Sequence, residues 1–139
     1  MFFHSRSLQI EWGHCDPAGI VFNPRYFEYF DWSTALLFER ALGLTKPEML
    51  KTYDAAGIPL VDTRARFLSP CRYGETIEIT SSVLKLGRSS FEVEHRVFNG
   101  EALAVEGVET RVWTERDRAE PSRLKAVPIP AAIVAKLSQ

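Results

Sequence analysis

Residues 23–43 of the chain read NPRYFEYFDWSTALLFERALG. Asparagine before proline is typical of a helix start, and glycine is typical of the residue that follows a helix. The spacing therefore predicts one long helix from Pro24 to Leu42, with Asn23 as its N-cap and Gly43 as its stop. At about 100° per residue, one half of this helix is strongly apolar. That half carries Tyr26, Phe27, Phe30, Thr34, Ala35, Leu37, Phe38, Ala41 and Leu42, whereas Glu28, Ser33, Glu39 and Arg40 fall on the other half. So many aromatic side chains predict a helix that a sheet wraps.

The segments on both sides of this helix alternate between apolar and polar residues, as strands do. One strand is predicted before the helix and four after it, at Ser5–Trp12, Pro59–Phe67, Thr76–Leu86, Ser89–Asn99 and Ala102–Thr114. Short turns with Gly74, Gly87 and Gly100 favour antiparallel neighbours. A second, shorter helix is predicted at Pro47–Ala56. The order predicts an α+β fold, a long helix covered by a curved five-stranded antiparallel sheet. The open edges of such a sheet favour an oligomer.

The composition limits the class of protein. A length of 139 residues with 45% hydrophobic positions predicts a single domain over residues 1–139. The formal charge of -1 argues against a nucleic-acid or anionic-membrane surface. Two cysteines, Cys15 and Cys71, make no disulfide framework and no pattern of metal ligands. Neither a signal peptide nor an apolar run of ~20 residues is visible, so we expect a soluble, cytoplasmic protein.

Asp16 is the first candidate for chemistry. It lies in the loop between the first strand and the N-terminus of the long helix. The unsatisfied N–H groups of a helix start stabilise negative charge, so a carbonyl bound there is polarised and its oxyanion stabilised. A carboxylate beside it can act as nucleophile or base. The alternative is that Asp16 only forms an Asx-turn before proline.

Asp31 is the second candidate, because it falls inside the apolar half of the helix, between Phe38 and Leu42. Carboxylates seldom lie on a buried face without a partner. One interpretation is a polar group at the floor of an apolar pocket that accepts a hydrogen bond from a ligand. The other is an acid at the border of the apolar arc that pairs with an arginine or points outward.

Other polar residues are weaker candidates. Cys15 beside His14 suggests a thiol nucleophile with a base, but sequence neighbours on an extended loop point apart and no third group orients them. His95 alternates with apolar residues on one strand, which favours a satisfied core or interface histidine. The residues Lys85 and Arg88–Ser90 surround a turn, where they form either a phosphate site or a solvated hairpin tip.

The run from Glu11 to Phe27, EWGHCDPAGIVFNPRYF, resembles the signature of the 4-hydroxybenzoyl-CoA thioesterase family. The core of that signature is D-x-x-G-I/V-V-x-x-x-x-Y entering a central helix. The segments Gly57–Val61, Phe67–Glu78 and Gly87–Phe91 are also similar to that family. The resemblance covers most of the chain and weakens after about Glu115.

The resemblance implies a hot-dog fold, with dimers that pair into a homotetramer and active sites at subunit interfaces. It implies that Asp16 is the catalytic carboxylate and that the backbone N–H of Asn23 polarises the thioester carbonyl. It also implies that Asp31 receives a ring hydroxyl. The positions that match the acyl and pantetheine channel are Ile58, Pro59 and Leu60, and those that match the nucleotide end of CoA are Arg88, Ser89 and Ser90.

The resulting hypothesis is an enzyme that hydrolyses an aryl-CoA, 4-hydroxybenzoyl-CoA in the first place, to the free acid and CoA. It needs no metal or redox cofactor, since CoA is part of the substrate. One alternative is a thioesterase for short aliphatic acyl-CoAs, like the Tol-Pal-associated relatives. The other is an acyl-CoA-binding hot-dog domain without chemistry. Asp31 in the apolar arc argues against the first alternative, and the presence of Asp16 argues against the second.

Overall fold

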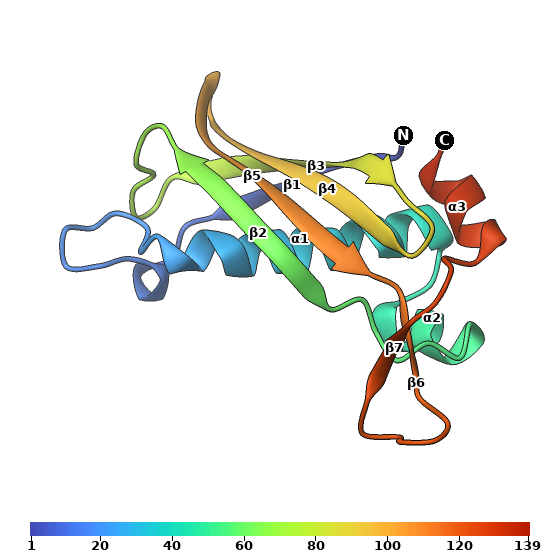
Figure 1. Ribbon diagram of the computed structural model, residues 1–139. Coiled ribbons are helices and arrows are strands. Elements are labelled where there is room, and N and C mark those ends of the chain that lie inside the picture. The colour runs from blue at the N-terminus through green and yellow to red at the C-terminus, as the bar shows by residue number, and fades with distance from the viewer.

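A computed structural model describes all of residues 1–139, and a five-stranded antiparallel sheet lies across one long helix (Figure 1). The helix is α1 (Pro24–Leu42). In spatial order the strands are β1 (Phe3–Gln9), β3 (Thr76–Leu86), β4 (Ser90–Asn99), β5 (Ala102–Val112) and β2 (Leu60–Phe67). All neighbouring pairs are antiparallel. The predicted α+β class and hot-dog arrangement are confirmed, and so are the predicted bounds of α1.

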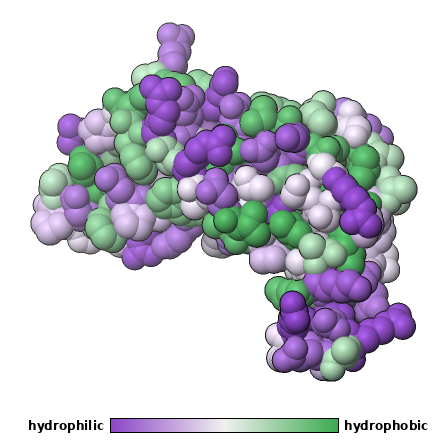
Figure 2. All heavy atoms as spheres, viewed as in Figure 1, coloured by the Kyte–Doolittle hydropathy of each residue, from purple (hydrophilic) through white to green (hydrophobic).

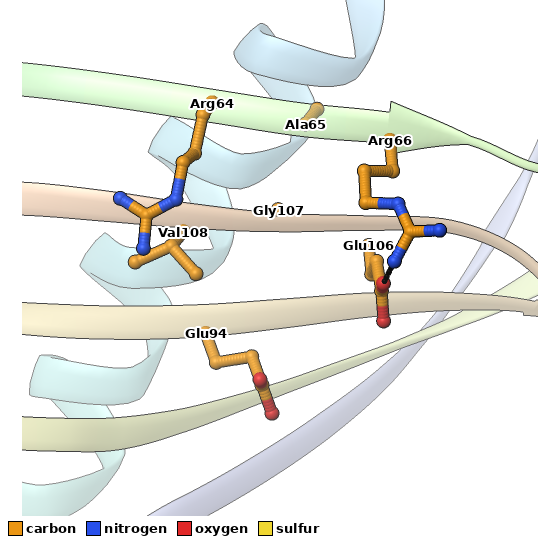
Figure 3. Close-up of a pocket in the computed structure, with 7 residues that line it drawn as sticks. All are labelled: Arg64, Ala65, Arg66, Glu94, Glu106, Gly107 and Val108. Atoms are coloured by element: carbon orange, nitrogen blue, oxygen red, sulfur yellow. Dashed lines mark hydrogen bonds and ion pairs between the residues drawn. The ribbon is translucent and has the colours of Figure 1, made fainter.

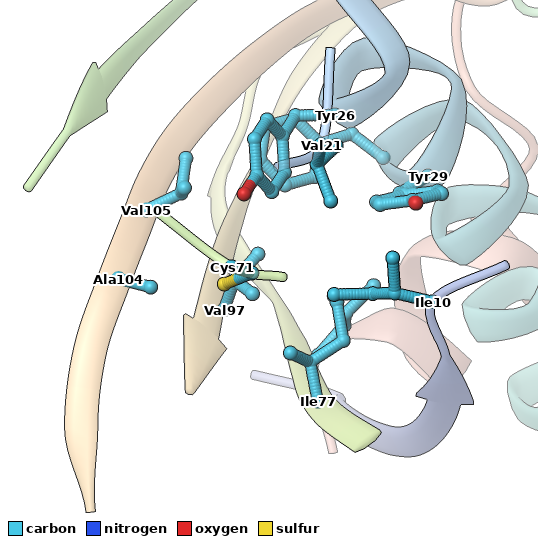
Figure 4. Close-up of a cluster of buried hydrophobic side chains, with 11 residues drawn as sticks. Ile10, Val21, Tyr26, Tyr29, Cys71, Ile77, Val97, Ala104 and Val105 are labelled. Carbon is cyan, nitrogen blue, oxygen red and sulfur yellow. The ribbon is translucent and has the colours of Figure 1, made fainter. Parts of the chain in front are cut away.

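The helix packs on the sheet through two buried clusters. The first includes Tyr26 and Phe30 from α1 with Ile77 and Val97 from the sheet. Figure 4 shows Tyr26 and Tyr29 reaching from the helix toward these sheet residues. The second cluster lies at the other half of α1 and adds Trp113, with the C-terminal helix α3 (Ala131–Leu137). Each large apolar side chain buried in this way stabilises the fold by about 1.5–3 kcal/mol.

The buried face of α1 is rotated relative to the face that the sequence predicts. Ser33, which the wheel places on the polar half, is fully buried and accepts a hydrogen bond from Arg6 Nε at 2.9 Å. Tyr29 beside it is also buried, at 6% exposure. Asp31, which the wheel places inside the apolar arc, has a side chain that is 65% exposed. The buried arc therefore ends at Phe38, and Asp31 stands just outside its border. Of the two interpretations of Asp31, this exposure favours the acid at the border of the apolar arc over the polar group at the floor of a buried pocket.

The first strand is β1, and its predicted span of Ser5–Trp12 is shifted. After Ile10 the chain turns into a short 3-10 helix, η1 (Trp12–His14). The N–H of His14 donates to the Glu11 carbonyl at 3.0 Å, which closes this turn. As a result Trp12 leaves the sheet and packs edge-on against Tyr73, with ring centroids 5.4 Å apart.

Three other elements differ from the sequence prediction. The second helix is α2 (Lys46–Thr52), begun by Thr45 in a capping box and shorter than the predicted Pro47–Ala56 because Asp54 takes a left-handed conformation, with φ of 51°. The last predicted strand breaks after β5. The chain then forms β6 (Thr114–Arg116), paired with β7 (Leu124–Ala126), a hairpin that the sequence analysis missed. No helix of the protein combines the length and the apolar character that a membrane crossing needs.

Gly107 lets α1 approach β5, since a Cβ at this position would lie 2.6 Å from Phe30 Cε2 and 3.1 Å from the Arg64 carbonyl oxygen. We expect Gly107→Ala to lower the free energy of unfolding by about 1–3 kcal/mol, because the Phe30 ring must move in a packed core. Urea unfolding measures this. Gly13→Ala is the control, since nothing lies within 4 Å of its Cβ position. Equal midpoints for the two variants would contradict the prediction.

Candidate active site

Asp16 sits in a tight loop that leads from η1 to α1. The loop is closed by hydrogen bonds from Asp16 N to the Ile20 carbonyl and from Gly19 N to the Asp16 carbonyl, both at 2.9 Å. Gly19 has a φ of 78°, a left-handed conformation that glycine adopts without strain. The Tyr73 N–H donates to the Gly19 carbonyl at 2.9 Å and ties the loop to the segment before β3. The carboxylate is therefore carried by a fixed backbone.

The carboxylate of Asp16 has one engaged oxygen and one free oxygen. Oδ1 accepts the N–H of Ala18 at 2.8 Å, which is the Asx-turn that the sequence allowed. Oδ2 has no hydrogen-bond partner, and the residue is only partly buried. The Asx-turn and a chemical role are thus compatible, because the turn fixes the carboxylate and leaves one oxygen available.

The N-terminus of α1 offers a free donor next to this loop. Asn23 is the residue before the helix, as predicted, but it has αR backbone angles and its side chain makes no capping bond. Its backbone N–H donates to no acceptor in the chain. A hollow of about 310 Å³ lies here and is lined by Ile20, Val21, Asn23, Tyr26, Phe67, Leu68, Ser69 and Pro70. A helix start with a free N–H beside an apolar hollow suits a polarised carbonyl.

Asp31 is paired with an arginine from the sheet. Nη2 of Arg111, on β5, donates to Asp31 Oδ1 at 2.7 Å. Asp31 Oδ2 has no partner. The Arg111 side chain is only 5% exposed, so a buried cation holds one oxygen of an exposed carboxylate. This is the arginine-paired alternative of the sequence analysis, and it leaves an acceptor free for a ligand.

Behind Arg111 lies a buried polar network. Glu109 Oε2 accepts from Arg111 Nη2 at 2.8 Å, and Glu109 Oε1 lies 3.1 Å from His95 Nε2. Thr34 Oγ1 also donates to Glu109, and His95 Nδ1 lies 2.7 Å from Ser81 Oγ. The prediction of a satisfied core histidine at position 95 is confirmed.

The network sets the charge of its members. Burial alone would raise the pKa of Glu109, but the hydrogen bonds and charges of His95 and Arg111 lower that pKa to about 2. Burial alone would lower the pKa of Arg111, but its bonds to Glu109 and Asp31 raise that pKa above its ordinary value. Both groups are therefore ionised at neutral pH, and the pair stays charged inside the protein.

The other predicted site residues lie apart from Asp16 within one chain. The Ile58 side chain is buried in the second core cluster, and its carbonyl oxygen accepts from Arg111 Nη1 at 3.0 Å. Pro59 accepts from Val112 N, and Leu60 is 44% exposed at the start of β2. Arg88, Ser89 and Ser90 form the β3–β4 turn, at the end of the molecule opposite the Asp16 loop (Figure 1).

A second hollow, of about 320 Å³, lies on the outer face of the sheet (Figure 3). Arg66 Nη1 donates to Glu106 Oε1 at 3.2 Å across it. The remaining lining residues are Arg64, Ala65, Glu94, Gly107 and Val108, none of which the sequence analysis selected. No group of three or more His, Cys, Asp or Glu side chains is placed to hold a metal ion.

Sequence reasoning missed Glu109 and Arg111. A signal for them exists, because alternation along β5 puts Gly107, Glu109, Arg111 and Trp113 on the face that packs on α1. Two opposite charges two residues apart on a core face indicate a buried ion pair. Their partners, at positions 31, 34 and 95, are far away in sequence and cannot be identified from it.

Comparison with known proteins agrees with this geometry. The model of the thioesterase-like superfamily matches residues 10–137, which include the loop, the helix and every strand of the sheet except β1. This chain belongs to the thioesterase-like superfamily. The predicted thioester hydrolase is thereby confirmed.

Three matches show how similar this chain is to known members of the family. The 4-hydroxybenzoyl-CoA thioesterase of Pseudomonas sp. strain CBS-3 is 32% identical over 131 residues, covering 88% of this chain and 89% of that protein. The solved structure of that enzyme matches with a TM-score of 0.88 at 26% identity, over 98% and 99% of the two chains. A 4-hydroxybenzoyl-CoA thioesterase mutant complexed with 4-hydroxybenzoyl-CoA matches with a TM-score of 0.90 at 25% identity, over 99% of both chains.

Proposed function

We propose that this thioesterase hydrolyses an aryl-CoA, and specifically 4-hydroxybenzoyl-CoA, to 4-hydroxybenzoate and CoA in the cytoplasm. The observation that carries the proposal is Asp31, whose Oδ1 is held by a buried arginine while its Oδ2 remains free and exposed. An aliphatic acyl chain gives that oxygen no partner, whereas a phenol donates to it. The 4-hydroxybenzoyl-CoA thioesterase that is 32% identical to this chain supports the same substrate.

In the proposed reaction, Asp16 supplies the carboxylate and the N–H of Asn23 supplies the donor for the oxyanion. Acting as a base, Asp16 takes a proton from water while the water oxygen bonds to the thioester carbonyl carbon. The C–S bond then breaks and the CoA sulfur takes up the proton. Acting as a nucleophile, Asp16 bonds through Oδ2 to the thioester carbonyl carbon while the C–S bond breaks, and the released CoA thiolate takes up a proton from water. Water then hydrolyses the acyl-enzyme anhydride to the free acid and the Asp16 carboxylate. Both routes need the free Oδ2 of Asp16 and a polarised carbonyl, and neither needs a metal or redox cofactor.

We further propose that two copies of the chain complete each site and that dimers pair into a homotetramer. Asp31 lies eight residues beyond Asn23, roughly 12 Å along the axis of α1, and it is paired with Arg111 of β5, whereas the Asp16 loop is tied to the segment before β3. The predicted CoA contacts Arg88, Ser89 and Ser90 are at the far end of the same chain. A second copy can bring its Asp31 and its Arg88 turn to the Asp16 loop of the first.

The edge strand β2 is the surface that supports such pairing. Its backbone has no neighbour on one side, and Leu60, Val61 and Phe67 are 44%, 58% and 45% exposed. Figure 2 shows hydrophobic side chains at the surface in the region that β2 crosses in Figure 1. An unpaired strand with apolar side chains is a template for another strand. Pro59 and Leu60 stand at the start of this strand, so they would line the acyl channel beside the partner chain, with the buried Ile58 supporting them from the core.

The test is CoA release followed with a thiol-trapping dye. The panel holds 4-hydroxybenzoyl-, 3-hydroxybenzoyl-, benzoyl-, phenylacetyl- and butyryl-CoA. We expect kcat/KM to be highest for 4-hydroxybenzoyl-CoA, by at least about tenfold over benzoyl-CoA, because only the hydroxyl satisfies Asp31. Equal rates across the panel would contradict the aryl assignment and favour a short-chain aliphatic enzyme. Tight binding of every thioester with no release would instead favour a binding domain.

A further inference from the structure

Arg111 joins the two elements that carry the proposed acyl-binding residues. It donates from Nη2 to Asp31 on α1 at 2.7 Å and from Nη1 to the carbonyl of Ile58, just before β2, at 3.0 Å. No other side chain is hydrogen-bonded to either group. The apolar side chain of Ile58 packs with Leu37 and Phe38 of α1, and Arg111 adds the only side-chain hydrogen bonds to Asp31 and to the Ile58 carbonyl.

Glu109 fixes the orientation of that guanidinium. Arg111 Nε donates to Glu109 Oε1 at 3.2 Å, and Nη2 donates to Oε2 at 2.8 Å, a two-point contact that sets the plane of the group. Glu109 is itself held by Thr34 and His95, and its side chain is 2% exposed. A charged pair fixed in this way has little freedom to follow a ligand. A ligand must therefore fit Asp31 in the one position in which Arg111 holds its carboxylate.

The hydrogen-bonding capacity of the cluster determines what it accepts. Arg111 makes four hydrogen bonds, to Asp31, to Glu109 and to the Ile58 carbonyl, and these use four of its five N–H donors. Two carboxylates, Asp31 and Glu109, share this one cation. The exposed end of the cluster is Asp31 Oδ2, an acceptor on a group with excess negative charge. A ring substituent that donates a hydrogen bond fits there, and one that only accepts does not.

We propose that Arg111 is a positioning residue that aims Asp31 Oδ2 at the acyl ring and so selects rings with a hydrogen-bond donor. This inference rests on the proposed aryl-CoA function. Arg111 does not touch the substrate; it acts through Asp31 on one side and through the Ile58 segment on the other. Glu109 belongs to the same unit, because without it the guanidinium has no fixed plane.

The experiment compares 4-hydroxybenzoyl-CoA with 4-fluorobenzoyl-CoA, whose ring is similar in size but has no donor. The measured quantity is the ratio of the two kcat/KM values. Comparing this ratio between variants cancels the intrinsic reactivity of each thioester. We expect Arg111→Lys to lower both rates and to lower the ratio by roughly tenfold, because lysine keeps the charge but loses the fork. Arg96→Lys is the matched control, since Arg96 contacts only Glu94 on the surface at 3.3 Å.

A double-mutant cycle separates positioning from a general loss of structure. If Arg111 acts through Asp31, then Arg111→Lys in an Asp31→Asn background lowers the ratio no further. A second drop of similar size in that background would overturn the proposal. Where Arg111→Lys does not yield folded protein by circular dichroism, Glu109→Gln combined with Arg111→Gln removes both charges together and is expected to lower the ratio as well.

The outcomes distinguish this inference from the proposed function. A wild-type ratio near one contradicts the proposed preference for 4-hydroxybenzoyl-CoA itself. A high wild-type ratio that Asp31→Asn lowers and Arg111→Lys leaves unchanged keeps the proposed function and overturns the role of Arg111. A high ratio that both substitutions lower, without adding to each other, supports both.

Discussion

Asp16→Asn is expected to lower kcat for the preferred acyl-CoA by about 10²- to 10⁴-fold, the range that removal of a catalytic acid or base produces. An amide neither takes a proton from water nor attacks a thioester carbon. It does retain an oxygen that can accept the Ala18 N–H, now bonded to Asp16 Oδ1 at 2.8 Å. The loop should therefore keep its shape, and KM should change by only a few-fold. Initial rates of CoA release across substrate concentrations separate the two parameters.

Asp117→Asn is a matched control for this substitution. Asp117 Oδ1 accepts the N–H of Ala119 at 2.9 Å, the same turn contact, but it lies in the β6–β7 connection. We expect its kcat and KM to equal those of the wild type. If Asp16→Asn kept more than about a tenth of the activity, Asp16 would not be the catalytic carboxylate. Cys15→Ser then tests the neighbouring thiol, whose one hydrogen bond goes from Sγ to the Glu11 carbonyl at 3.6 Å.

Local patterns explain why much of the fold was predictable. The bounds of α1 and of β3 agree with the sequence prediction, because proline, glycine and the apolar period act within a few residues. The Asp16 loop was predictable for the same reason, since its turn contacts join residues two to four apart. The β6–β7 hairpin was not, because its second strand, Leu124–Ala126, has only 3 residues and is exposed throughout.

The candidate site was predictable only in part, because its contacts cross the chain. Asp31 was selected for a reason that the structure contradicts, namely burial. Its environment is decided by Arg111, 80 residues away. The wheel also misplaced Ser33, because Arg6 on β1 covers it. Periodicity shows that a helix has a buried face, but the neighbouring strands decide where that face ends.

Glu109 is expected to be the residue whose loss costs the most stability. Its carboxylate neutralises Arg111 inside the protein and also accepts from Thr34 and His95. Removing one partner of a buried pair leaves an uncompensated charge, which costs about 3–5 kcal/mol. We expect Glu109→Gln to lower the free energy of unfolding by about 3 kcal/mol, near the lower end of that range, because its amide oxygen can still accept from the guanidinium.

The pH dependence of the free energy of unfolding is an independent test of the stabilising role of Glu109. The pKa of Glu109 falls from 4.5 to about 2 on folding. A lowered pKa stabilises the fold above the unfolded value and loses that effect as the pH falls through the folded one. The stabilisation should thus be about 3 kcal/mol at pH 7 and less than half of that at pH 3. Urea unfolding at both pH values should show that the difference in free energy of unfolding between wild type and Glu109→Gln falls to less than half between pH 7 and pH 3.

The control is Glu94→Gln, which removes a surface pair with Arg96 and should lower the free energy of unfolding by under about 1 kcal/mol. A gap of equal size at both pH values would show that the charge of Glu109 does not stabilise the fold.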